Sequence, residues 1–128
     1  MTDPTLLRDF FPKDPILIAK NVLKAATGKD VLLPNTGFLR TALTKKVSRC
    51  FGGYIGPPIY STQGNVDSCM LQEIAEECSR HGFVSKEDIK KRIEDIGWVD
   101  LIKEVGDAIQ KSITEIVEKE QRRFLESL

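Results

Sequence analysis

The side chains best placed for chemistry are a cysteine and the sole histidine of the sequence. Cys78 and His81 form a C-x-x-H pattern near the end of an expected helix, with both side chains on about the same face. A structural zinc site needs four ligands, and no second C-x-x-C or H-x-x-H element supplies the others. A catalytic nucleophile and base would have to use the same histidine. We therefore predict no metal, no cofactor and no catalytic residue, and an enzyme or enzyme subunit is the third of three hypotheses.

A second set of residues is suited to binding anions. From Pro15 to Val66 the only acid is Asp30, whereas basic residues are frequent. On an expected helix over 36–50 these basic residues lie opposite the apolar face, and a loop rich in glycine, proline and tyrosine follows at 52–65. Proteins that bind single strands combine a positive surface with aromatic side chains on which bases stack. The predicted binding residues are Arg40, Lys45, Lys46 and Arg49 on the helix and Tyr54 and Tyr60 in the loop.

The charge is divided between the two halves of the chain. Residues 1–64 hold nine basic and four acidic residues, a net charge of +5, and residues 65–128 hold ten basic and fifteen acidic residues, a net charge of −5. This asymmetry indicates either an anionic partner or neutralisation of one half by the other. In the purely structural alternative, the lysines are a solvated helix face and the loop is an ordinary connection that covers the core.

The three cysteines, Cys50, Cys69 and Cys78, are an odd number at spacings that match no disulfide framework or zinc motif. They are expected to be buried, reduced thiols used as small apolar side chains. A chain of 128 residues is long enough to form one domain with a sizeable core. No disulfide or metal is therefore expected to be needed for stability.

Apolar residues at helical spacing predict one all-α domain over 1–128, a compact bundle of five or six helices with a long C-terminal helix. Asp, Ser, Thr and Pro mark the helix starts, and Gly marks the ends. The fourth helix is expected to point Glu73, Glu76, Glu77 and Arg80 outward. The expected helices run from Pro4 to Phe11, from Pro15 to Gly28, from Asn35 or Thr36 to Gly52, from Asn65 or Asp67 to His81, from Ser85 to Gly97, and from Trp98 onward.

The last helix is expected to be longer than the domain is wide. Thirty residues at ~1.5 Å each make about 45 Å, against a diameter of roughly 30 to 35 Å for a domain of this size. Its apolar residues would be core if the helix folds back, or a dimer contact if it projects. Self-association through this helix is therefore one expectation.

Two short patterns resemble known signals. "LPNTG" at 33–37 looks like the LPxTG signal that sortases cleave, although that signal works near a C-terminus and ninety residues follow here, so a helix start after a proline is the preferred interpretation. The hairpin over 74–97 resembles a helix-turn-helix DNA reader in outline, but Glu77 and Asp88 occupy positions where that family has apolar residues.

Membrane insertion is not indicated, because apolar runs such as "ILIA" at 16–19 are far shorter than the ~20 residues that span a bilayer. The acids and prolines of the first residues are unlike a secretory signal, and an intracellular, cytoplasmic location is expected. The leading hypothesis is a non-catalytic interaction or adaptor protein that binds an acidic protein surface. The alternative is a nucleic-acid-binding protein that uses the same residues. Replacing Lys45, Lys46 and Arg49 with alanine is expected to leave the fold intact, because these residues oppose the apolar face, and to abolish binding.

Overall fold

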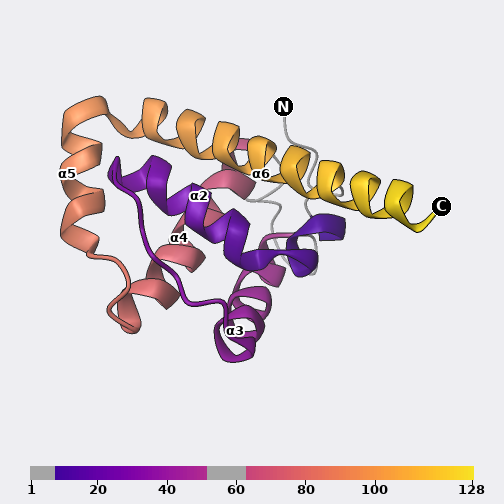
Figure 1. Ribbon diagram of the computed structural model, residues 1–128. Coiled ribbons are helices and arrows are strands. Elements are labelled where there is room, and N and C mark those ends of the chain that lie inside the picture. Colours follow the sequence, from indigo (N-terminus) through magenta and orange to yellow (C-terminus); the bar gives the residue numbers. More distant parts are fainter. Residues whose placement is uncertain (1–7, 52–62) are drawn as a thin grey trace.

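The computed structural model describes residues 8–51 and 63–128, and the regular structure within these ranges is helical, which confirms the predicted all-α bundle (Figure 1). Residues 1–7 and 52–62 lie outside the described residues, and with them half of the expected first helix and most of the predicted loop. The helices are η1 (Phe11–Lys13), α2 (Pro15–Thr27), α3 (Gly37–Val47), η2 (Ser48–Cys50), α4 (Gln63–Arg80), α5 (Lys86–Ile96) and α6 (Trp98–Ser127).

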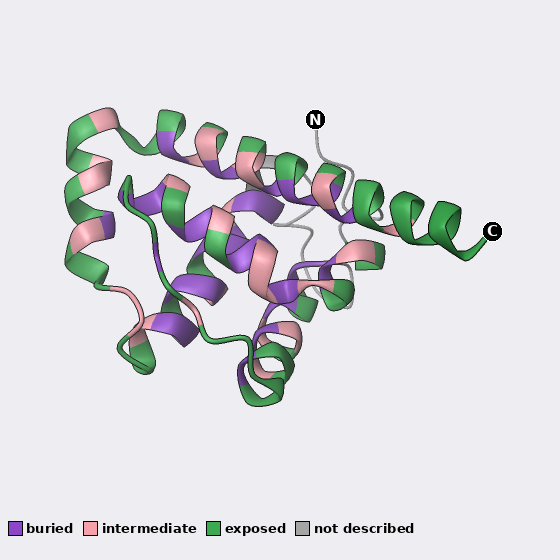
Figure 2. Cartoon of the chain, viewed as in Figure 1, coloured by how far each residue is buried: buried purple, intermediate pink, exposed green. Residues whose placement is uncertain are grey.

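Helix α2 forms the centre of the bundle and packs against α3, α4, α5 and α6. Its start is set by Asp14, whose side chain accepts a hydrogen bond from the amide of Leu17 at 3.1 Å. Its end is set by Gly28, which has φ +73° and donates its amide to the Lys24 carbonyl, as the sequence predicted. The central residues of α2 are fully buried, as the purple ribbon in Figure 2 shows: Ile18, Ala19, Val22, Leu23 and Ala26.

Helix α6 spans 30 residues and crosses the whole bundle. One stripe, from Leu101 to Ile116, is buried against the core, mainly on α2 and α4. Lys119 and Glu120 still form ion pairs with Asp14 and Lys13. Beyond them the helix extends past the other described elements, and residues 121–128 are all exposed (Figures 1 and 2). Phe124 is 61% exposed and Leu128 is 87% exposed, so these apolar residues of the predicted stripe project and are not core. No helix among the described residues is long and apolar enough to cross a membrane.

Helix α4 begins earlier than the sequence indicated. The predicted caps Asn65 and Asp67 lie inside the helix, because it starts at Gln63. Asp67 is buried and lies against α6 at Gly106, where a Cβ atom would be only 2.7 Å from Asp67 Oδ2. Gly106 is therefore the point at which α4 and α6 approach too closely for a side chain.

A disulfide bond joins Cys50, at the end of η2, to Cys69 in α4. The expectation of three reduced cysteines is therefore wrong for two of them, and only Cys78 is a free, buried thiol. Spacing along the chain gave no sign of the pair, because α3 and α4 become neighbours only when they pack together. The bond closes a loop over a sequence separation of 19 residues.

We expect the Cys50–Cys69 bond to stabilise the fold by about 3 kcal/mol, since it restricts the unfolded chain by closing a loop of this length. Chemical denaturation with and without a reductant measures this difference. The double variant Cys50→Ala/Cys69→Ala should unfold at the lower concentration of denaturant in both conditions. Equal stability of the oxidised and reduced wild type would contradict the expectation.

Gly106→Ala should lower the free energy of unfolding by about 1 to 3 kcal/mol, because the added methyl group overlaps the Asp67 carboxylate. Thermal unfolding followed by circular dichroism measures the change. Gly37→Ala is the matched control, since a Cβ atom there meets nothing within 4 Å. Alanine at an unobstructed helical glycine is neutral or stabilising by about 0.5 to 1 kcal/mol. The same result at both positions would show that the close approach at Gly106 is not a constraint.

Candidate functional site

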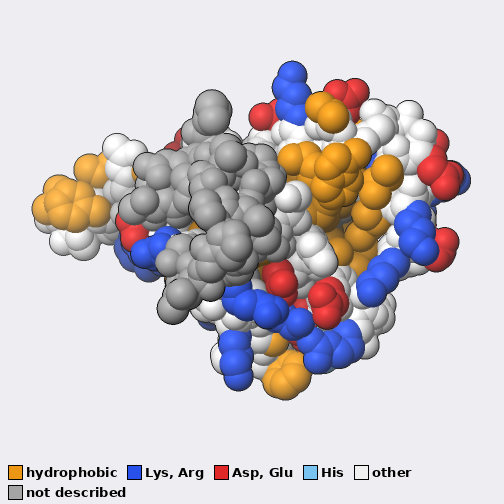
Figure 3. All heavy atoms as spheres, turned by 180° about the vertical axis from the view of Figure 1, so that it is seen from behind, with side chains coloured by type: hydrophobic (Ala, Val, Ile, Leu, Met, Phe, Trp, Pro, Cys, Tyr) orange, Lys and Arg blue, Asp and Glu red, His pale blue; other side chains and the backbone are white. Residues whose placement is uncertain are grey.

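Two adjacent hollows of about 520 Å³ and 500 Å³ lie along the outer side of α3 and share Lys45. We name Arg40, Lys45, Lys46, Arg49 and Arg80, which line them, the α3 cationic surface. Figure 3 shows Lys and Arg side chains gathered along this edge of the molecule, with acidic side chains beside them. The structure thus brings together four predicted binding residues and adds Arg80 from the end of α4.

Local sequence explains why these side chains point outward. The side chain of Thr36 caps α3 by accepting a hydrogen bond from the amide of Leu39 at 3.2 Å, so "LPNTG" is a helix start here. Leu39, Leu43 and Val47 are buried, as predicted. The opposite face therefore carries the cations to the surface.

The acidic half of the chain neutralises part of this surface. Lys46 Nζ lies 3.5 Å from Glu76 Oε1 and 3.9 Å from Glu73 Oε2, and Arg49 Nη2 lies 3.7 Å from Glu73 Oε1. The Glu73 side chain is only 14% exposed, so its charge depends on these partners. Lys46 and Arg49 therefore have acidic partners within the chain, and replacing both would leave the poorly solvated carboxylate of Glu73 without them.

Arg40 and Lys45 differ from these two residues. Both are exposed, and neither forms an ion pair with another described residue. Lys45 lies where the two hollows meet, and Arg40 lines the second. These two side chains are consequently the cations most available to a ligand.

Glu77 is buried, 4% exposed, although the sequence predicted that it points outward. Its Oε2 lies 2.7 Å from Nε2 of His81, and its Oε1 accepts a hydrogen bond from Arg80. A buried carboxylate requires such partners, because it has lost its hydration. Glu77 therefore holds Arg80 and His81 in place at the wall of the first hollow.

An aromatic side chain completes this wall. The Phe38 ring is 72% exposed and meets the His81 ring edge to face, with centroids 5.6 Å apart. One stripe along α3 and η2 lines the first hollow, since its residues recur at i, i+4, i+7 and i+11: Phe38, Ala42, Lys45 and Arg49. That spacing is visible in the sequence, and it is the signal by which Phe38 could have been included among the predicted residues. Tyr54 and Tyr60 lie outside the described residues.

The histidine and carboxylate pair invites comparison with a catalytic dyad. Cys78 lies three residues before His81, and burial together with the neighbouring charge of Glu77 raises the pKa of its thiol to about 12. Its thiol is therefore protonated at neutral pH and is a poor nucleophile. Within the described ranges, no group of three or more His, Cys, Asp or Glu side chains is placed to hold a metal ion. The geometry at His81 is that of a structural contact beside the α3 cationic surface.

Comparison of the chain with protein-family models, curated proteins and solved structures finds no match. The function proposed below consequently rests on the charge and geometry of the α3 cationic surface.

The raised pKa of Cys78 predicts a pH dependence of stability. The unfolded thiol ionises near pH 9, so the folded state retains a proton that the unfolded chain loses between pH 9 and 12. The contribution of this thiol is fully present below pH 9 and is lost as the pH rises, by about 1.4 kcal/mol per pH unit. Denaturation of wild type and Cys78→Ala from pH 8 to 10.5 measures it. The wild type should lose stability more steeply, and parallel curves would contradict the assignment.

Proposed function

We propose that this chain is a non-catalytic helical binding protein, of the interaction or adaptor kind, that holds an acidic protein surface on the α3 cationic surface. The observation that carries the proposal is the pair of hollows that meet at Lys45, with cations around both. Of these cations, Arg40 and Lys45 are exposed and have no acidic partner among the described residues.

Arg49 is placed to bind a partner without giving up its internal contact. Its side chain is 62% exposed, whereas that of Glu73, 3.7 Å away, is only 14% exposed and needs its cationic neighbours. A guanidinium has five N–H donors, so a carboxylate from a partner can engage those that face solvent. Arg40 and Lys45 attract that partner at a distance.

Nucleic acid is the second candidate ligand, and one observation favours it. Phe38 presents an exposed ring beside His81 and close to Lys45 at the wall of the same hollow. Bases stack on such rings while phosphates contact neighbouring cations. Removing the Phe38 ring should weaken this mode of binding and leave the binding of an acidic protein largely unchanged.

The oxidation state of Cys50 and Cys69 indicates in which cellular compartment the protein binds its partner. The sequence predicts a cytoplasmic location, but disulfides form and persist mainly in oxidising compartments. The Cys50–Cys69 bond therefore favours a protein that works under oxidising conditions. We propose that the binding form is the oxidised one. Alkylation of free thiols at the moment of cell lysis, followed by mass spectrometry, reports which form is present.

Reversing two charges tests the proposed site. Arg40→Glu/Lys45→Glu should lower the affinity for fluorescent poly-glutamate by about tenfold or more, since attraction becomes repulsion at both positions. Fluorescence anisotropy at two salt concentrations measures this, and single-stranded RNA serves as the second probe. If Phe38→Ala lost its binding to RNA but kept its binding to poly-glutamate, nucleic acid would be identified as the ligand.

The matched control is Lys20→Glu/Lys111→Glu, which changes the net charge equally at exposed positions on α2 and α6. It should bind both probes almost as the wild type does. Equal weakening by both double variants would show that only net charge matters. Absence of binding to either probe at low salt would refute the proposal.

A further inference from the structure

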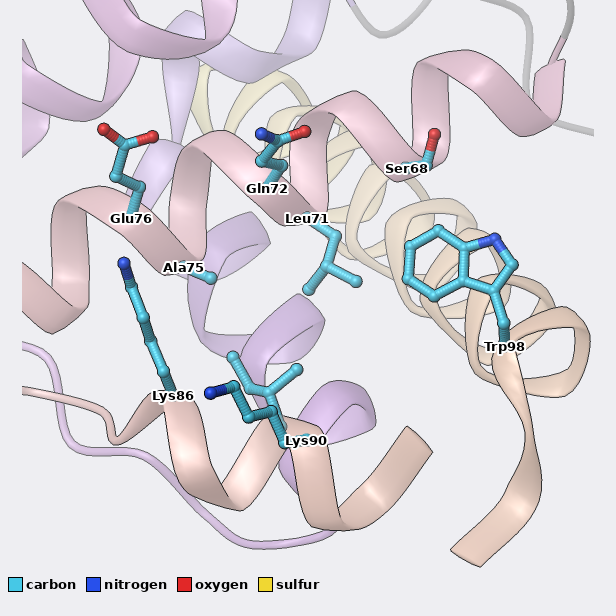
Figure 4. Close-up of a pocket in the computed structure, with 9 residues that line it drawn as sticks. Ser68, Leu71, Gln72, Ala75, Glu76, Lys86, Lys90 and Trp98 are labelled. Carbon is cyan, nitrogen blue, oxygen red and sulfur yellow. The ribbon is translucent and has the colours of Figure 1, made fainter. Parts of the chain in front are cut away.

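A third hollow, of about 390 Å³, lies between α4, α5 and the start of α6. Leu71 and Ala75 of α4, Ile89 of α5 and Trp98 of α6 form its apolar wall. Charged side chains of both signs stand at its edge: Lys86, Lys90 and Glu76. Figure 4 shows Leu71 and Trp98 turned toward the space and both lysines rising from the opposite helix. Trp98 is 50% exposed, although tryptophan has much to gain from burial. We name this hollow the Trp98 groove.

The projecting end of α6 has the complementary character. Val117, Phe124 and Leu128 follow one another at i, i+7 and i+11, so they form one apolar stripe, and they are 41%, 61% and 87% exposed. Exposed side chains of both signs flank this stripe, with Arg122 and Arg123 beside Glu118 and Glu126. The chain therefore carries an exposed apolar stripe at one end of α6 and an apolar groove at the other end of the same helix.

The placement of these two surfaces suits a symmetric pair of molecules. In Figure 3 hydrophobic side chains gather at the projecting end of α6 and again beside α5, on the same face and at opposite sides of it. Trp98 and Phe124 are 26 positions apart on one helix, roughly 39 Å at 1.5 Å per residue. A two-fold axis between two such faces brings each helix end to the groove of the other copy. Both contacts then form at once, and the assembly is closed.

We propose that the Trp98 groove binds the end of α6 from a second copy of this chain, which makes a two-fold symmetric dimer with antiparallel α6 helices. Phe124 and Leu128 of one copy enter the groove of the other. The groove shares no lining residue with the two hollows of α3, and Glu76 at its edge is the ion-pair partner of Lys46.

The sequence contains a single tryptophan, so the intrinsic fluorescence of the protein reports on the environment of Trp98 in the groove. As the protein concentration increases, analytical ultracentrifugation should show monomers forming dimers. Over the same concentrations the fluorescence emission of Trp98 should shift to shorter wavelength, because the dimer buries this side chain. Phe124→Ser/Leu128→Ser should raise the dimer dissociation constant by about 10- to 100-fold or more, from the loss of large buried side chains. Leu32→Ser is the matched control, because Leu32 is an apolar residue 84% exposed elsewhere on the surface. A wild type that stays monomeric at every concentration would overturn the proposal. So would an increase of the dissociation constant in Leu32→Ser as large as that in Phe124→Ser/Leu128→Ser.

Mixing two defective variants provides a second, independent test. Trp98→Ser impairs the groove but keeps the helix end, whereas Phe124→Ser/Leu128→Ser keeps the groove. Each variant alone should be largely monomeric, and their mixture should form dimers through one intact contact. Since only the second variant contains tryptophan, a blue shift on mixing reports the helix end entering the groove. An unchanged spectrum would overturn the proposed contact even if the wild type is dimeric, and circular dichroism of each variant verifies that it is folded.

Discussion

The burial of α2 is the constraint from which the other features follow. Its central residues have no exposed surface, and it packs against α3, α4, α5 and α6. Each of these helices must turn an apolar stripe toward α2, so their charged faces point outward. Where α3 and α4 lie side by side, the basic half of the chain meets the acidic half. The cations left without acidic partners at that boundary are the ones available for binding.

Helix positions were largely predictable because local chemistry sets them. Asp14 and Thr36 accept amide hydrogen bonds at helix starts, and Gly28 and Gly97 adopt the positive φ that other residues avoid. The early start of α4 was missed because the sequence suggested later caps. The inner face of α3 was also correct, since apolar residues at helical spacing are buried whichever helix covers them.

Contacts between helices were not predictable from the same patterns. Glu77 looks like a surface residue on its own helix, and its burial follows from the approach of α3. The neutralisation of Lys46 and Arg49 likewise depends on which face of α4 lies opposite. Counting charges showed that the two halves of the chain complement each other. Which residues pair could be learned only from the packing, and the same holds for the disulfide.

The Cys50–Cys69 bond also changes the covalent connectivity of the protein. The backbone between the two cysteines is one of two covalent paths that link the helices before it to those after it. A single cut there, by a protease or by design, would give two chains that stay joined through sulfur. New termini, an affinity tag or an inserted domain can therefore be placed in this segment with the two halves of the bundle still tethered. The molecule would separate into two pieces only under reducing and denaturing conditions.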